Sequence, residues 1–115
     1  HPESGQLYSS EHGQSAHDEI NKIEAGKNYG WPIIEGNETE DGMVSPILHS
    51  GNETWAPSGM TFVSEGPWEN QLMVANLRGT QLLIVELDAS GEGVNNVEML
   101  IKEEYGLIRN IVEGP

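Results

Sequence analysis

Cysteine is absent from this chain of 115 residues. The chain can therefore build neither a disulfide framework nor a thiolate metal site or thiolate nucleophile. Apolar runs are also short, and none approaches the roughly 20 residues that a membrane-spanning helix requires. No N-terminal signal pattern is visible. Membrane insertion is not expected, and the cellular compartment stays open on composition.

Basic residues are scarce as well, with five Lys and Arg against 19 Asp and Glu and a formal net charge of −14. A field of this sign repels phosphate backbones and anionic lipid headgroups. Nucleic acid and membrane surfaces are therefore not expected as partners. The acidity either keeps the protein soluble or attracts calcium.

The chain lacks a glycine-rich phosphate cradle, a GxSxG elbow and a Cys/His dyad, so kinase, nucleotide-binding and serine-hydrolase functions have no support. Helix-period stripes are scarce, and 14 glycines punctuate short β-prone runs. This pattern predicts an all-β, mostly antiparallel protein. The expected strands are residues 6–10, 59–63, 71–76, 81–87, 97–102 and 107–112.

The runs LMVAN and LLIVEL flank a turn at Leu77-Arg78-Gly79-Thr80, which predicts a β-hairpin, and a third strand follows from Val97. An antiparallel meander of about four strands is the unit of a β-propeller blade, and roughly two such units fit in this chain. Residues 36–51 are polar and rich in turn formers, and we interpret them as a long loop.

Residues 11–32 hold the densest chemistry of the chain, and the roles of their side chains stay open at this point. A carboxylate beside a glycine-punctuated loop is a partial cage for calcium, which suits Glu19. Asp18 and Glu19 equally suit the first turn of a helix, where acidic residues oppose the helix dipole. His12 and His17 lack the spacing of a zinc motif. His12 is either a hydrogen-bonding residue at a pocket mouth or a solvated loop residue.

Six sequence stretches occur in an order that resembles one family: LYSSEHG, DEIN, GKNYGWP, WAPSGMTF, LMVANLRGTQLLIVELD and GLIRNIVEGP. The chain is similar to the soluble pyrroloquinoline-quinone (PQQ)-dependent glucose/sorbosone dehydrogenases, also called aldose sugar dehydrogenases, over nearly its whole length. Members of this family are six-bladed β-propellers that oxidise the C1 hydroxyl of aldoses to lactones, with calcium at the quinone. The resemblance implies that residues 1–115 are an internal fragment of a longer bacterial chain. That fragment would comprise a calcium and quinone loop at about 11–32 and later blade strands at about 55–115.

The resemblance also implies roles for individual residues around calcium and the sugar. His12 matches a residue that lines the sugar pocket. Gly13 and Gln14 match the pair whose main-chain carbonyls bind the calcium that holds PQQ, although proline is usual where Gln14 stands. Glu19, by its carboxylate, and Tyr29, by its backbone carbonyl, match the ligands of a second, structural calcium.

Three further positions match residues that contact the quinone. Thr54 matches a hydroxyl at the quinone, and Arg78 stands where lysine often faces a quinone carboxylate, an ion pair that arginine can also make. The family has two arginines in the region of GLIRN, and this chain keeps the second, Arg109, with Leu107 in place of the first. One anionic contact to PQQ is therefore expected to be lost.

We therefore expect an enzyme whose full-length form binds a sugar substrate and an electron acceptor and is secreted, periplasmic or attached to the cell surface. The catalytic base of the family would lie upstream of His1, so the fragment alone should be inactive. Unpaired strand edges should make it self-associate. The alternative is a calcium-stabilised propeller that serves as a binding or scaffold module with a lapsed quinone site. The third possibility is a β domain whose acidic loops only keep it soluble.

Overall fold

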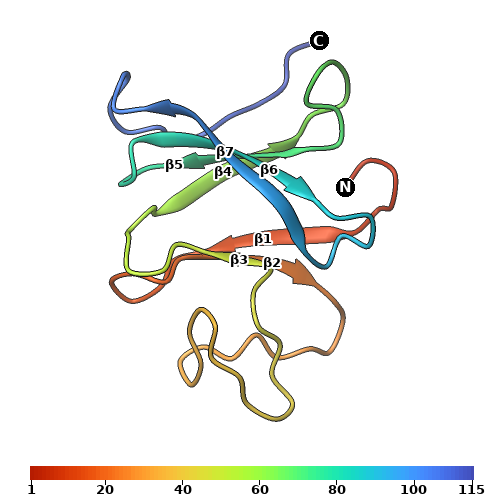
Figure 1. Cartoon of the computed structure of the whole chain (residues 1–115), viewed down its shortest axis with the longest axis vertical. Helices are drawn as coiled ribbons and strands as arrows, with labels where there is room; N and C mark the ends of the chain where they lie inside the picture. The colour runs from red at the N-terminus through yellow and green to blue at the C-terminus, as the bar shows by residue number, and fades with distance from the viewer.

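The computed structural model describes residues 1–115 and contains two antiparallel sheets and no helix, so it has no segment that could cross a bilayer as a helix. The first sheet has three strands in the order β1 (Leu7–Glu11), β2 (Glu19–Ile23) and β3 (Leu48–His49). β1 and β2 pair along their full length, so that Glu11 lies opposite Glu19. A long excursion from residue 24 to residue 47 precedes β3 and forms the separate lower lobe in Figure 1.

The second sheet is a four-stranded meander of β4 (Pro57–Phe62), β5 (Leu72–Asn76), β6 (Gln81–Leu87) and β7 (Val94–Lys102). β5 and β6 are buried over most of their length and carry a nearly continuous apolar run, as central strands covered on both faces do. β7 is largely exposed and forms one edge of the sheet. The expected hairpin at Leu77 to Thr80 is confirmed, because Asn76 pairs with Gln81 at its base.

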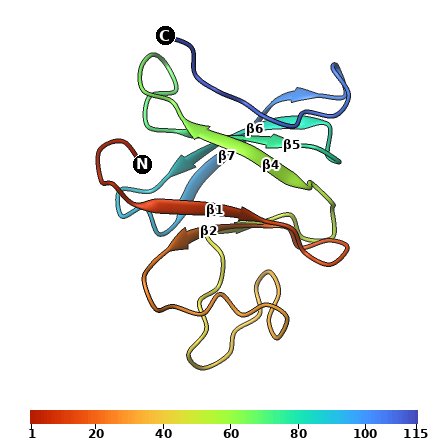
Figure 2. The ribbon, with the colours of Figure 1, turned by 180° about the vertical axis from the view of Figure 1, so that it is seen from behind.

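The two sheets lie side by side with β1 next to β4, as both ribbon views show (Figures 1 and 2). Ser10 on β1 donates its hydroxyl to the Ser58 carbonyl on β4 at 3.2 Å. Ile20 on β2 is fully buried and joins the second sheet in one apolar cluster, whose other buried members are Leu72, Val74, Leu83 and Val85. This shared core fixes the position of one sheet relative to the other.

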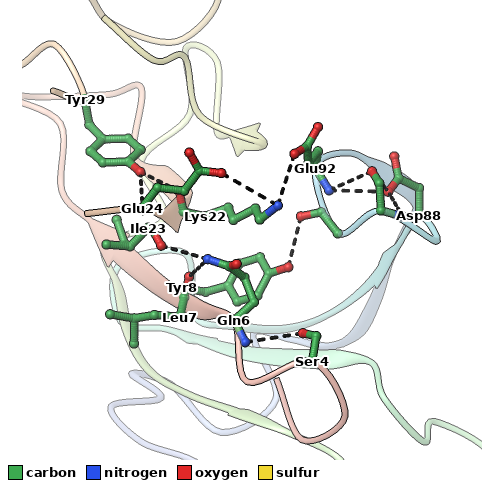
Figure 3. Close-up of polar contacts among 12 residues, drawn as sticks. Ser4, Gln6, Leu7, Tyr8, Lys22, Ile23, Glu24, Tyr29, Asp88 and Glu92 are labelled. Atoms are coloured by element: carbon green, nitrogen blue, oxygen red, sulfur yellow. Dashed lines mark hydrogen bonds and ion pairs between the residues drawn. The ribbon is translucent and has the colours of Figure 1, made fainter. Parts of the chain in front are cut away.

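At the other end of β1, a polar clasp ties the first sheet to the β6–β7 turn (Figure 3). The Tyr8 hydroxyl donates to the Gly91 carbonyl at 2.9 Å, and the Lys22 ammonium donates to the Glu92 carboxylate at 3.2 Å. Burial raises the pKa of Tyr8 above 10.0, and the hydrogen bond to Glu92 raises the pKa of Lys22 above 10.5. Hydrogen bonds from Ser90, followed by the amides of the turn, lower the pKa of Asp88 below 3.8.

Two sequence-based expectations about secondary structure are wrong. Residues 107–112 form no strand, because that segment shares only a single main-chain contact with β4, from Gly59 to Arg109. Asp18 and Glu19 do not begin a helix; Glu19 opens β2, where pairing with β1 and β3 decides the conformation. The loop expected at 36–51 is confirmed except for the two residues of β3.

Candidate functional site

The site lies at one end of the molecule, where β1, β5 and β7 end and β4 and β6 begin, on the right in Figure 2. Residues 54–59, the segment that leads into and begins β4, are its centre. The main-chain carbonyls of Trp55 and Ala56 accept hydrogen bonds from Gly79 and Leu77, both at 2.9 Å. These bonds hold the β5–β6 turn, which carries Arg78, against the 54–59 segment.

The loop after β1 is held against the same 54–59 segment. The His12 Nε2 atom lies 2.9 Å from the Pro57 carbonyl, and the Thr54 hydroxyl donates to the Ser15 carbonyl at 2.6 Å. Because a carbonyl can only accept, the His12 Nε2 carries the proton and leaves Nδ1 free for another partner. His12 is otherwise exposed, which is compatible with both a pocket-mouth residue and a solvated loop residue.

The C-terminal segment reaches the same centre from the other side. The Gly59 N–H donates to the Arg109 carbonyl at 2.9 Å. Both Arg78 and Arg109 are exposed, and neither guanidinium forms an ion pair within this acidic chain. The two guanidinium groups therefore stay available for an anionic ligand. The structure thus brings the segments of His12, Gly13, Thr54, Arg78 and Arg109 together.

Asp18, which sequence reasoning left as a helix-start residue, is central to this arrangement. Its side chain is only 2 % exposed, and its two carboxylate oxygens accept from the main-chain N–H groups of Gly13 at 3.0 Å, Trp55 at 2.6 Å and Ala56 at 2.9 Å. One signal could have revealed it. Adjacent residues at the start of a strand point to opposite faces, so one of Asp18 and Glu19 had to face inward.

Gly13 has no room for a side chain, because a Cβ there would collide with the Ala16 carbonyl oxygen. The loop therefore folds back tightly on itself between Gly13 and His17. Gln14 lies in this loop with an exposed side chain. The carbonyl roles implied for both residues stay predictions.

A recess of about 110 Å³ lies beside this loop and is lined by three carboxylates, Glu11, Glu19 and Glu35, with no Lys or Arg. His12 and Gly13 line it too. Glu19 accepts from the Gly36 N–H at 3.1 Å, and the Asn21 amide donates to both Glu11 and Glu19 at 3.2 Å. The Asn21 Oδ1 atom is buried without a hydrogen-bond partner.

The three carboxylates of this recess supply oxygen ligands of the kind that calcium prefers. The Asn21 amide already lies between Glu11 and Glu19, so their mutual repulsion does not by itself require a cation. No group of three or more His, Asp or Glu side chains is itself arranged to hold a metal ion. A bound ion would therefore need main-chain carbonyls or water to complete its shell.

Tyr29 does not line this recess with its side chain. Its hydroxyl donates to the Lys22 carbonyl and accepts from the Glu24 N–H, both at 2.7 Å, at the opposite end of β2 from Glu19 (Figure 3). Two residues that follow Tyr29 in the chain, Trp31 and Ile34, do line the recess, and Ile34 packs on Gly30. The phenol is thus hydrogen-bonded to the main chain of Lys22 and Glu24 and not to the recess. The calcium role implied for the Tyr29 carbonyl stays a prediction.

Comparison with known proteins gives matches along the whole chain. A family model described as glucose/sorbosone dehydrogenase matches residues 1–115. The aldose sugar dehydrogenase YliI of Escherichia coli K12 is 28 % identical over 129 residues, which cover 99 % of this chain and 34 % of that protein.

Solved structures agree with this match. A putative oxidoreductase (glucose dehydrogenase) from Thermus thermophilus is 35 % identical with a TM-score of 0.85, over 100 % of this chain and 33 % of that one. The PQQ-bound aldose sugar dehydrogenase of Streptomyces coelicolor is 33 % identical with a TM-score of 0.81, over 94 % of this chain and 30 % of that one. The chain thus spans about a third of the length of these relatives. The predicted fold class is confirmed: the chain is all-β and forms part of a β-propeller.

Proposed function

Because the chain belongs to the glucose/sorbosone dehydrogenase family, we propose that it is part of a longer PQQ-dependent enzyme that oxidises the C1 hydroxyl of aldose sugars to lactones. The observation that carries this proposal is the convergence of His12, Gly13, Thr54, Arg78 and Arg109 on the 54–59 segment. These residues come from four separate parts of the chain. A relative that is 33 % identical carries PQQ in its solved structure, which supports this cofactor.

The two arginines are the groups suited to hold an anionic cofactor. PQQ carries carboxylates, and a guanidinium binds a carboxylate through two parallel N–H donors. Arg78 and Arg109 have no competing carboxylate within the chain. Charge-assisted hydrogen bonds of this kind contribute about 1.5–3 kcal/mol each. Bound PQQ would supply the two-electron acceptor that amino-acid side chains lack.

His12 would orient the sugar. With Nε2 donating to the Pro57 carbonyl, the ring is held in one direction and presents Nδ1 to a hydroxyl group of the substrate. By the family resemblance, the base that takes the proton of the C1 hydroxyl would lie upstream of His1. We therefore expect the isolated fragment to be inactive.

Calcium would bind at two places. The carbonyls of Gly13 and Gln14 would face the ion that holds PQQ, and Glu19 with the Tyr29 carbonyl would hold a structural ion. Glu19 lies in the recess with two further carboxylates, which supports a calcium-binding role for Glu19, and Tyr29 does not line this recess. Export to the periplasm or beyond is proposed on the family resemblance alone.

Reconstitution of the full-length protein tests this function. Apoprotein is titrated with PQQ and calcium, and dye reduction is followed with several aldoses, with the lactone identified as the product. Arg109→Gln should weaken PQQ binding, and Glu19→Gln should weaken calcium protection against heat. Calcium binding without a PQQ absorbance change would favour the scaffold alternative, for which the leucine at position 107 is the motivating observation.

A further inference from the structure

Asp18 is the one buried carboxylate that the proposed chemistry leaves without a role. Burying a carboxylate is costly unless its oxygens are well hydrogen-bonded. No Lys or Arg pairs with Asp18, and all of its side-chain bonds come from three main-chain N–H groups. The Asp18 carboxylate therefore joins the loop after β1 to the segment that enters β4. All three bonds form only when each donating peptide unit lies in its present position.

Two of the three peptide units that Asp18 holds lie next to proposed site residues. The N–H of Gly13 belongs to the His12–Gly13 peptide, so this bond fixes the direction in which His12 leaves the loop. The N–H of Trp55 belongs to the Thr54–Trp55 peptide, so the second bond fixes Thr54. No other side chain contacts both loops through its charged group.

The influence of Asp18 extends one step further, to the β5–β6 turn. The peptide units on either side of Trp55 donate to Asp18, while the carbonyls of Trp55 and Ala56 accept from Gly79 and Leu77. A shift of the 54–59 segment would therefore move the turn that carries Arg78. One carboxylate thus governs the relative positions of three segments.

The main chain of Asp18 is itself firmly anchored. Its N–H donates to the Ser50 hydroxyl and its carbonyl accepts from the Ser50 N–H, both at 2.9 Å. The carboxylate therefore projects from a fixed point at the start of β2. Loops that are hydrogen-bonded to a fixed carboxylate keep their geometry before a ligand binds. This lowers the conformational entropy that is lost on binding.

We propose that Asp18 is the positioning residue of the quinone site, and that its carboxylate holds the His12–Gly13 loop, Thr54 and the Arg78 turn in their binding geometry. This inference rests on the proposed function, because it names a residue that serves the same site. Asp18 touches neither cofactor nor substrate in this role.

The test uses the full-length protein with Asp18→Asn, Asp18→Glu and, as a matched control, Tyr8→Phe. Asn has the same size as Asp but places an NH₂ group, which cannot accept, against main-chain N–H donors. At least one of the two loops therefore loses its hydrogen bond to residue 18. Tyr8→Phe removes a hydrogen bond between the same two sheets, far from the site. The readouts are the apparent Kd for PQQ from absorbance titration in calcium, kcat and KM for glucose, and hydrogen exchange at the amides of residues 13, 55 and 56.

Asp18→Asn should raise the apparent Kd for PQQ by about tenfold or more, the loss expected when a charge-assisted bond fails. It should also speed exchange at the three amides and raise KM for glucose at saturating PQQ. Tyr8→Phe should lower the melting temperature and leave the Kd unchanged. A folded Asp18→Asn protein with the wild-type Kd and KM would overturn the proposal.

Asp18→Glu covers the case in which Asp18→Asn fails to fold. Its longer side chain keeps the charge but cannot satisfy all three donors in their present places, so we expect a smaller rise in Kd. A wild-type Kd in this variant would also overturn the proposal. If the wild-type protein binds no PQQ, the proposed function fails instead. In that case hydrogen exchange alone tests the positioning role of Asp18. Unchanged protection of the amides of residues 13, 55 and 56 in either variant refutes that role.

Discussion

The Gly59 N–H donates to the Arg109 carbonyl at 2.9 Å, and this bond lays the C-terminal segment across the start of β4. A Cβ at position 59 would collide with the Asn110 side chain and lie only 2.7 Å from the Asn110 Cα. The close approach of the two main chains therefore depends on the absence of a side chain at residue 59.

Gly59→Ala should displace the segment that carries Arg109. We expect a loss of about 1–3 kcal/mol in the free energy of unfolding, as in other overpacked sites, together with weaker PQQ binding. Chemical denaturation and PQQ titration of the full-length protein measure the two effects. Gly114→Ala is the matched control, since a Cβ there meets nothing within 4 Å. Equal behaviour of the two variants would contradict the close packing described here.

Leu107→Arg should tighten PQQ binding. Leu107 is 68 % exposed, so a guanidinium at this position needs no burial, and it lies two residues before Arg109. One added charge-assisted contact is expected to lower the Kd by about tenfold or more. Leu107→Gln is the uncharged control and should leave the Kd near the wild-type value. A gain with glutamine equal to that with arginine would show that charge is not the cause.

Tyr8→Phe should destabilise the contact between the two sheets. The phenol donates to the Gly91 carbonyl, and its removal should cost about 1 kcal/mol. The expected result is a lower melting temperature with unchanged PQQ affinity. An unaltered melting temperature would mean that water replaces the phenol at the Gly91 carbonyl without loss.

Stability should fall at both ends of the pH range through the polar clasp of Tyr8, Lys22 and Asp88. The folded-state pKa values of Tyr8 and Lys22 are raised from 10.0 and 10.5, so their contributions are present below pH 10.0 and are lost as the pH rises through the raised values. The pKa of Asp88 is lowered from 3.8, so its contribution is present above pH 3.8 and is lost as the pH falls below it. Urea unfolding across pH measures both losses. Asp88→Asn should reduce the fall in the free energy of unfolding below pH 3.8. The same fall in the variant as in the wild type would contradict this.

The isolated chain of residues 1–115 should self-associate. β1 and β7 each pair on one side only, and β7 exposes Val97 and Met99. Unpaired strand edges with exposed apolar side chains template further pairing. Gel filtration at rising concentration should show dimers or larger species. Replacing Val97 and Met99 by lysine should shift the distribution toward monomer, and a wild-type chain that stays monomeric at every concentration would refute the prediction.

The sequence predicted the second sheet well, because β5 and β6 combine apolar runs with a clear turn at Leu77 to Thr80. It failed for β2, whose EINKI sequence has no alternation strong enough to outweigh an acidic pair that resembles a helix start. It failed again for residues 107–112, where an apolar run has only one main-chain bond to β4. Pairing partners far along the chain decide both cases, and local pattern cannot reveal them.

Part of the site was also predictable. Motif resemblance selected His12, Gly13, Thr54, Arg78 and Arg109, whose segments meet at residues 54–59. Asp18 was overlooked because its three main-chain donors cannot be identified from the sequence. The available signal, alternation of side chains at the start of a strand, required β2 to be predicted first. Tyr29 was selected for its carbonyl, while the fate of its phenol could be learned only from the fold.

The 54–59 segment both connects the two sheets and supports the loops of His12, Arg78 and Arg109. An inserted or deleted residue there would shift every one of these loops at once, so its length should be invariant among functional homologues. Residues 37–42, which are exposed and belong to the separate lobe, support none of these loops. Natural length variation, epitope tags and fusion partners should therefore be tolerated at residues 37–42 and nowhere near the entry to β4.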